Sequence, residues 1–282
     1  MDLVAHERLH AYSLDKAHER SHRVWRSDLV VVVTWFERDL EMALSTFPFE
    51  TGATFALMVK GTHKSCESIP AFLAPHVVLC AQLENAEGRD SHTISEFLRA
   101  HYHRLPRLMY FIQDDSKPRA EIEHIPRGNA SAFGEWVAGT EADPFAKSSS
   151  CLCNINLERW TSPDENDVGG YGGLYHPMQY ILETFLEWNI SESGITALRW
   201  PGACSFMLSA RAVRKKPRMF YTLLSELLRG GSERYNILRL CPDIRGVKFC
   251  RAAQDLAHVV ERLWFAMLDD RYEQRDLRLP PL

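Results

Sequence analysis

The segment Asp28-Leu-Val-Val-Val-Val-Thr-Trp35 holds five consecutive apolar residues, Leu29 to Val33, four of them β-branched. A run of this kind is typical of a strand that is covered on both faces, because alternation of apolar and polar residues appears only when one face meets water. Strands covered on both faces occur mainly in parallel sheets of α/β proteins. This segment therefore predicts the centre of a parallel sheet.

Segments of strand and helix type alternate after this first run. Three further apolar runs predict strands, and two stretches with helical spacing of apolar residues lie between them. The strands are expected at 54–61, 76–84 and 108–113, and the helices at 37–47 and 91–106. Alternation of this kind predicts an α/β fold with a mainly parallel sheet flanked by helices.

The remaining chain is richer in loops and helices. We expect a loop-rich stretch at 116–173, a helix at 177–188, a short strand followed by one or two helices at 204–231, and a last helix at 255–270. The sequence predicts a polar N-terminal helix over 1–27 and a single α/β domain over 28–282. Within that domain we expect a first half over 28–116 and a loop-rich and helical second half over 117–282; the resemblance described below implies that the first half binds a nucleotide and the second half the acceptor.

Composition excludes some functions. The 282 residues are 45% apolar and 25% charged with a net charge of −4, which gives no basic surface for nucleic acid. No stretch approaches the roughly 20 apolar residues that span a bilayer, and no apolar signal core is visible at the N-terminus.

The seven cysteines are odd in number, irregularly spaced and without a C-x-x-C pair. This pattern predicts reduced, mostly buried thiols and favours a cytoplasmic over a secreted location. Two sequons, Asn129-Ala-Ser and Asn189-Ile-Ser, would matter only in a secretory lumen.

Two adjacent carboxylates, Asp114 and Asp115, directly follow the strand predicted at 108–113. Ligands of parallel α/β sheets bind beyond the carboxyl ends of the strands. Oxygen ligands at such a place suit Mg²⁺ or Mn²⁺, which bridges to the phosphates of a substrate. The alternative is a strand that has simply reached solvent, where Asp is a common turn residue.

The same segments resemble the opening half of GT-A type glycosyltransferases. The resemblance rests on "VVVVTWFERDLEMAL", "FALMVKG" and "ENAEGRDSHTISEFLRAHYHRLPRLMYFIQDDS". It implies that Glu37 and Asp39 contact the nucleoside and that a divalent cation is held after the later strand. It also implies a donor-lining turn made by Asn85, Gly88, Arg89 and Asp90.

A closer resemblance, over about residues 28–270, is to the uncharacterised domain-of-unknown-function family 3431. It is carried by "GRDSHT", "HRLPRLMYFIQ", "NINLERW", "GACSFMLSARAVRKKPRMFY" and "VERLW". This resemblance supports the fold more than a reaction.

Two histidines are candidates for the same site. His92 follows the turn at Gly88 and either touches a phosphate or caps the helix. His176 lies in an expected loop and is a candidate third metal ligand beside Asp114 and Asp115.

The C-terminal half supplies four more candidates. Gly202 and Ala203, in a segment that resembles a glycosyltransferase loop, would let the backbone approach donor and acceptor closely; the alternative is a tight turn. Glu261 is a candidate general base for an acceptor hydroxyl, and Arg262 a candidate phosphate ligand, unless the two form a surface ion pair.

The sequence therefore favours a metal-assisted transferase that moves a sugar from a nucleotide-sugar to a hydroxyl acceptor, with Asp115 and Glu261 at the reacting groups and Mn²⁺ or Mg²⁺ as cofactor. A non-catalytic member that binds a carbohydrate or protein partner is the first alternative. A metal-dependent phosphoester hydrolase is the second.

Overall fold

The structure is a computed structural model of the chain. It describes residues 25–44, 47–61, 63–84, 88–114, 125–127, 129–142, 152–156, 181, 197–201, 205–229, 243–244, 247–248 and 253–268. These fall into two compact units. The first is drawn from 1–85, 100–148 and 205–211, and the second from 86–99, 149–204 and 212–282.

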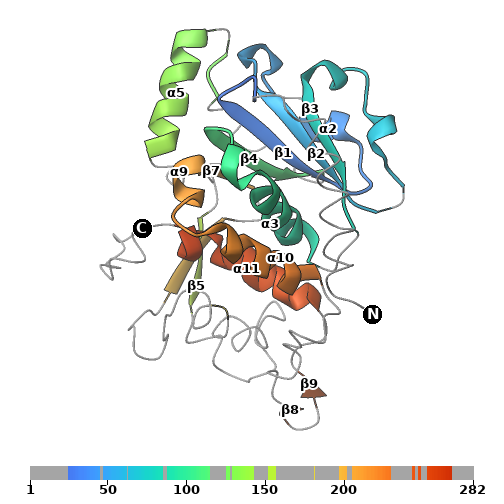
Figure 1. Cartoon of the computed structure of the whole chain (residues 1–282), viewed down its shortest axis with the longest axis vertical. Helices are drawn as coiled ribbons and strands as arrows, with labels where there is room; N and C mark the ends of the chain where they lie inside the picture. The colour runs from blue at the N-terminus through green and yellow to red at the C-terminus, as the bar shows by residue number, and fades with distance from the viewer. Residues whose placement is uncertain are drawn as a thin grey trace. The chain divides into compact units, whose positions relative to one another are not determined.

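The first unit is built on a five-stranded sheet in the order β3-β2-β1-β4-β7. Its strands are β1 (Leu29–Trp35), β2 (Thr54–Val59), β3 (Val77–Gln82), β4 (Leu108–Gln113) and β7 (Phe206–Ser209). The first four pair in parallel and β7 joins β4 antiparallel, as the side-by-side arrows of Figure 1 show. The prediction of a mainly parallel α/β sheet is confirmed, with every predicted strand of the first 115 residues present.

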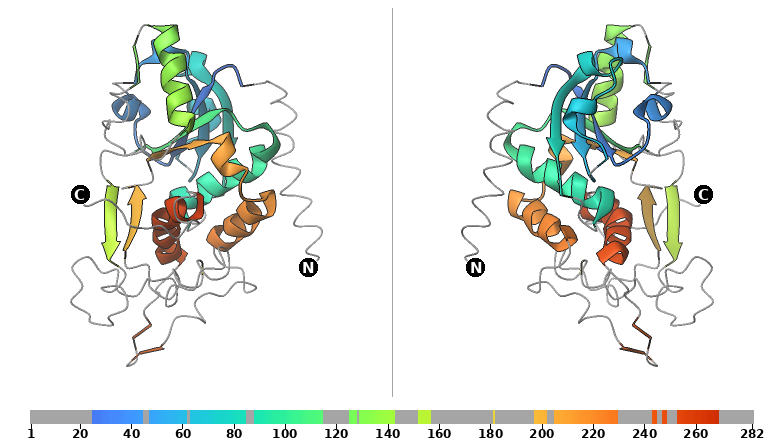
Figure 2. Two further views of the ribbon diagram at one scale, coloured as in Figure 1. Left: turned by 90° about the vertical axis from the view of Figure 1, so that its left-hand side faces the viewer. Right: turned by 90° about the vertical axis from the view of Figure 1, so that its right-hand side faces the viewer.

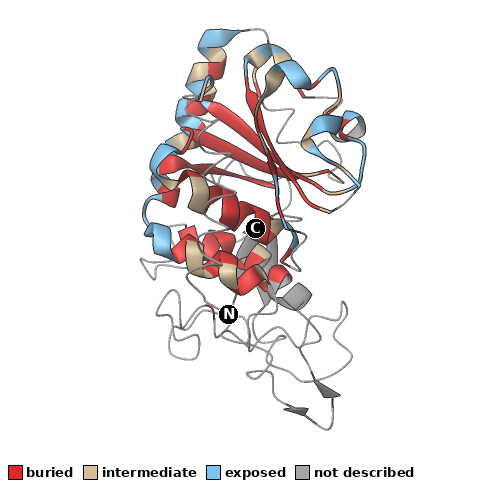
Figure 3. Cartoon of the chain, turned by 45° about the vertical axis from the view of Figure 1, so that its right-hand side comes forward, coloured by how far each residue is buried: buried red, intermediate tan, exposed pale blue. Residues whose placement is uncertain are grey.

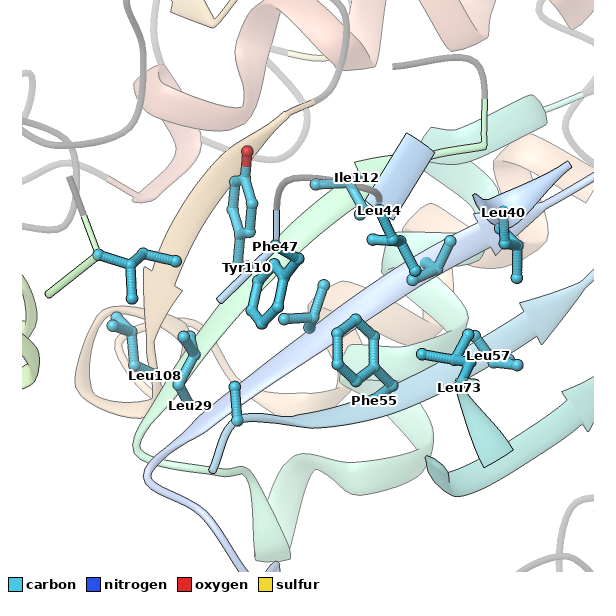
Figure 4. Close-up of a cluster of buried hydrophobic side chains, with 14 of the residues drawn as sticks. Leu29, Leu40, Leu44, Phe47, Phe55, Leu57, Leu73, Leu108, Tyr110 and Ile112 are labelled. Atoms are coloured by element: carbon cyan, nitrogen blue, oxygen red, sulfur yellow. The ribbon is translucent and has the colours of Figure 1, made fainter. Parts of the chain in front are cut away.

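The central strands are buried on both faces (Figure 3), as the unbroken apolar run of β1 predicts. Alternate residues of neighbouring strands share one face. Val31 of β1 lies in register with Phe55 of β2 and Tyr110 of β4, and all three belong to one core cluster. Figure 4 shows this cluster with Leu40 and Leu44 of α2 (Leu40–Leu44) packed over the strands.

The crossover from β2 to β3 carries a disulfide between Cys66 and Cys80, whose Cα atoms are 5.8 Å apart. Both cysteines are half-buried and pack against the same core cluster. The prediction of reduced thiols is therefore wrong for this pair. The pairing arises because β3 runs beside β2, which returns Cys80 to the short 3-10 helix η2 (Cys66–Ser68).

Helix α5 (Ala130–Ala142) lies inside the stretch predicted to be loop-rich, so that prediction is wrong here. Phe133 and Val137 of α5 enter the core cluster at a spacing of one helical turn. Arg107 ties the end of the helix to the start of β4 through an ion pair with Glu141 at 2.5 Å.

The described residues of the second unit include long helices and two small antiparallel sheets. The long helices are α3 (Arg89–His101, of which residues to Arg99 belong here), α10 (Arg218–Arg229) and α11 (Ala253–Leu268). The pair β5 (Leu152–Asn156) and β6 (Ala197–Pro201) runs beside α11, as both views of Figure 2 show. The second pair is β8 (Asp243–Ile244) with β9 (Val247–Lys248).

The predicted strand and helices of 204–231 are confirmed as β7, α9 (Ala210–Val213) and α10, and the last predicted helix is confirmed as α11. The polar helix expected at 1–27 and the helix expected at 177–188 lie outside the described residues, apart from Trp25 to Ser27 and Ile181. None of the helices in the described part of the chain is long and apolar enough to cross a membrane.

Candidate functional site

The carboxyl ends of β1 and β4 lie at the point where the strand order reverses. From β1 the chain moves outward to β2 and β3, and then returns to place β4 on the other side of β1. In open α/β sheets this switch point is where ligands bind. It is also where the sequence predicts a metal, because Asp114 follows β4 directly.

Asp114 binds the turn that follows β1. Its Oδ2 accepts hydrogen bonds from the backbone N–H groups of Phe36, Glu37 and Arg38, at 2.8, 2.8 and 2.9 Å. Its own N–H donates to the carbonyl of Thr34 at 3.1 Å, which extends the β1–β4 ladder by one bond. The side chain is nearly buried, at 6% exposure.

Three successive N–H groups that converge on one point form a concavity suited to an anion, such as a phosphate. Here the carboxylate of Asp114 fills it. These three N–H groups therefore hold the chain's own side chain in place of a ligand. Within the described residues, the second carboxylate oxygen, Oδ1, makes no hydrogen bond. Any cation or ligand bound by Asp114 would use that oxygen.

Two other predicted residues lie in the same turn. Asp39 accepts a hydrogen bond from the N–H of Glu41 at 2.9 Å, so it caps the first turn of α2. Glu37 is exposed, and its carboxylate lies 3.8 Å from Nε2 of His63, which follows β2. Trp35 closes the turn by donating its indole N–H to the carbonyl of Arg38 at 3.0 Å.

The end of β2 contributes groups that the sequence analysis did not include. Lys60 is fully buried, and its N–H donates to the carbonyl of Trp35 at 2.8 Å. Gly61 turns the chain with a φ of 87°, a left-handed conformation that favours glycine. Lys64 then lies over the ring of Trp35, 5.6 Å from its centroid. Because β1 and β2 are parallel and adjacent, the residues that follow β2 lie at the same edge of the sheet as those that follow β1, and this order is the signal that points to Lys60, Gly61 and Lys64.

The described residues of the predicted donor-lining turn, Gly88, Arg89 and Asp90, lie in the second unit, at the start of α3. Gly88 is buried, and a Cβ there would collide with the carbonyl oxygen and Cβ of Leu228 on α10. Arg89 is exposed and has a φ of 46°, which is strained for a residue with a side chain. Asp90 lies in the first turn of α3, where a negative charge is favoured.

His92 is buried in the same first turn, and its N–H donates to the carbonyl of Gly88 at 2.9 Å. The helix begins before His92, so the predicted capping role does not apply to it. The imidazole of His92 is instead one of the groups that lower the pKa of Glu96, a buried carboxylate one turn further along α3.

Glu96 is the centre of a buried polar cluster that the sequence did not indicate. Its carboxylate accepts from Arg99 at 2.7 and 3.2 Å and from the hydroxyl of Ser225 on α10, and Arg229 lies 4.0 Å away. Burial alone would raise the pKa of Glu96, but Arg99, His92 and Ser225 together lower it from 4.5 to about 2. The cluster therefore holds a carboxylate anion between α3 and α10.

The other predicted site residues are placed only in part. Glu261 is half-buried on α11, in the second unit, and only the backbone of Arg262 is described. Asp115, Asn85, Gly202, Ala203 and His176 lie outside the described residues. Their predicted roles remain predictions.

Within the described part of the chain, no group of three His, Cys, Asp or Glu side chains is arranged to hold a metal ion. Of the predicted metal ligands Asp114, Asp115 and His176, only Asp114 lies among the described residues.

The fold and this edge define a mixed α/β protein with a mostly parallel, helix-flanked sheet and an acidic residue at its switch point. Comparisons with protein-family models, curated proteins and solved structures found no match to the chain.

Proposed function

We propose that the chain is a glycosyltransferase that transfers a sugar from a nucleotide-sugar to a hydroxyl acceptor, with a divalent cation at the carboxyl ends of β1 and β4. The observation that carries this proposal is the position of Asp114. It joins the two strand ends at the switch point and keeps one carboxylate oxygen without a hydrogen bond in the described part of the chain.

The surrounding residues support a site for a charged ligand with a ring. Lys64 offers a positive charge beside the β1 turn, and it is held near the ring of Trp35. Exposed Glu37 and His63 offer hydrogen-bonding groups from two adjacent strand ends. A nucleotide-sugar presents both a diphosphate and hydroxyl-bearing rings to such groups.

Asp114 and Asp115 would hold Mn²⁺ or Mg²⁺, which would stabilise the charge that grows on the departing diphosphate. The task of the β1 turn is different. By donating three N–H groups to Oδ2, it fixes the carboxylate plane and so orients Oδ1. Asp115, the next residue in the chain, would supply the second carboxylate.

The three hydrogen bonds to Oδ2 also favour a second candidate, a non-catalytic member of the fold that binds a carbohydrate or protein partner. In that protein Asp114 would only stabilise the turn, and no metal would be needed. Binding would then be independent of Mn²⁺.

A thermal shift measurement separates these functions. The wild-type chain would be tested against uridine, guanosine and cytidine diphosphate-sugars with and without Mn²⁺. A ligand at 100 times its dissociation constant adds about 2.7 kcal/mol of stability, which a melting curve detects. Asp115→Asn is the informative variant because Asp114 also stabilises the turn. Glu50→Gln changes an exposed carboxylate just before β2, at the opposite end of the strands, and serves as the control.

A Mn²⁺-dependent shift that Asp115→Asn abolishes and Glu50→Gln preserves is the expected result. Product analysis would then follow, and sugar or phosphate released without any acceptor would indicate hydrolysis in place of transfer. If no nucleotide-sugar shifts the melting curve, the transferase proposal is wrong. A carbohydrate that shifts it equally with and without Mn²⁺ would support the binding protein.

A further inference from the structure

We infer that Asn129 carries an N-linked oligosaccharide and that the chain folds in an oxidising secretory lumen. Two independent features of the first unit lead to this inference. One is the geometry of the Asn129-Ala-Ser sequon, and the other is the disulfide between Cys66 and Cys80.

The sequon lies at the surface, at the start of α5. Asn129 is exposed, and its Oδ1 accepts from the N–H groups of Ser131 and Ala132 at 3.0 and 3.2 Å. The side chain therefore caps the helix through its oxygen. Because the oxygen faces the helix, the amide nitrogen Nδ2 is directed away from these two donors. No hydrogen bond to Nδ2 occurs within the described residues.

A sugar on Nδ2 is compatible with this cap. N-glycosylation replaces one hydrogen of the amide and leaves Oδ1 as an acceptor, so both capping hydrogen bonds persist. The hydroxyl of Ser131, the third residue of the sequon, is at the surface and makes one 3.4 Å contact with Glu135. The bulky, solvated group that a glycan adds suits an exposed helix start of this kind.

The disulfide indicates the compartment in which the chain folds. Cys66 and Cys80 are paired, are half-buried, and pack against the core of the first unit. Disulfides persist in oxidising compartments and are rare where thioredoxin and glutathione keep thiols reduced. A sequon has a chemical consequence only in such a lumen. The two features are far apart in the sequence, yet they require the same compartment.

The inference involves two covalent steps, glycosylation of Asn129 and formation of the disulfide between Cys66 and Cys80. In glycosylation, Nδ2 of Asn129 bonds to the anomeric carbon of a polyprenyl-diphosphate oligosaccharide and loses one proton. The bond from that carbon to the diphosphate oxygen breaks, and the lipid diphosphate leaves with the bonding electrons. In disulfide formation, the two thiols lose two protons and two electrons, which reduce a protein disulfide donor to its dithiol.

The test uses the full chain isolated from its native cells by an affinity tag at the genomic C-terminus. Peptides are mapped by mass spectrometry before and after treatment with a peptide N-glycosidase in heavy-oxygen water. The enzyme removes the glycan and converts the glycosylated Asn to an Asp that carries the oxygen label. Thiols are alkylated before and after reduction. We expect labelled position 129 and cysteines 66 and 80 that react only after reduction.

Three variants assign the modification. Ser131→Ala breaks the sequon but keeps both capping N–H groups, and Asn129→Ser keeps a capping oxygen but removes the acceptor nitrogen. Both should lose the glycan at this position without a change in melting temperature, whereas Ser131→Thr should retain it. Asn189→Gln controls for the second sequon, which lies outside the described residues.

Either an unmodified Asn129 or thiols at 66 and 80 that react without reduction would overturn the inference. A mass addition that survives both Ser131→Ala and Asn129→Ser would also overturn the assignment to Asn129. Loss in those two variants and retention in Ser131→Thr and Asn189→Gln would support it.

Discussion

Replacement of Asp114 by Ala is expected to destabilise the first unit strongly, even with no metal or ligand present. The change removes the shared acceptor of three backbone N–H groups in the β1 turn. A hydrogen bond to a charged group contributes about 1.5–3 kcal/mol, but the turn is partly exposed and water would replace some of the loss. At about 1 kcal/mol for each N–H, the expected cost is about 3 kcal/mol.

Asp114→Asn separates the oxygen from the charge. The amide oxygen can still accept from the turn, but it carries no full negative charge, and charge-assisted hydrogen bonds are roughly twice as strong as neutral ones. We therefore expect about half the loss, roughly 1.5 kcal/mol. The order of stability should be wild type, then Asp114→Asn, then Asp114→Ala.

Urea denaturation measures this order. With a slope of about 3 kcal/mol per molar urea, the midpoint should fall by about 1 M for Asp114→Ala and about 0.5 M for Asp114→Asn. Amide hydrogen exchange gives a local readout, because the N–H groups of Phe36, Glu37 and Arg38 should lose protection first. An unchanged midpoint with unchanged exchange at these amides would refute the structural role of the carboxylate.

Three further predictions concern packing, pH and the disulfide. Gly88→Ala should lower the free energy of unfolding by about 1–3 kcal/mol, measured by urea denaturation, because the new Cβ meets the backbone of α10. Gly134→Ala should be neutral or stabilising, because its Cβ would meet nothing within 4 Å. Equal effects of the two substitutions would contradict the packing argument. Because the pKa of Glu96 is lowered, its ionised carboxylate contributes about 3 kcal/mol to the free energy of unfolding above pH 4.5, and this contribution is lost as the pH falls towards 2. The stability–pH curves of wild type and Glu96→Gln should therefore differ in slope only between these two pH values. Replacement of both Cys66 and Cys80 by Ala opens a short covalent loop and should lower the free energy of unfolding by about 3 kcal/mol, measured by urea denaturation. If the oxidised wild type is no more stable than this double variant, the disulfide does not stabilise the fold.

The sheet could be predicted from sequence because its signal is local. The runs Leu29 to Val33 and Leu108 to Ile112 are apolar throughout, a composition typical of strands that are buried on both faces. Helix α5 was missed because Gly134 and Gly139 lower its intrinsic propensity, although Phe133 and Val137 carry the correct spacing. Tertiary packing on β4 and β7 outweighs that propensity.

For the candidate site, the sequence could predict where it lies on the sheet but not which groups contact each other there. The sequence places Asp114 at the end of a strand, but the N–H groups that it binds are 76 to 78 residues earlier in the chain. No spacing rule connects the two segments before the strand order is known. The same limit applies to Glu96, whose partner Ser225 lies 129 residues away, and to the pairing of Cys66 with Cys80.

The two oxygens of Asp114 give a physical reason why a metal role and a structural role need not compete. Oδ2 is held by three donors, so the carboxylate loses little further conformational freedom when Oδ1 meets a cation. A preorganised ligand binds more tightly than a mobile one because its entropy is already lost. Asp115→Asn should therefore weaken Mn²⁺ binding and leave the urea midpoint unchanged, whereas Asp114→Asn should lower both. If Asp114→Asn lowers the midpoint and Mn²⁺ binding is undetectable even in the wild type, the carboxylate serves the turn alone, and the edge of the sheet must bind its ligand without a metal.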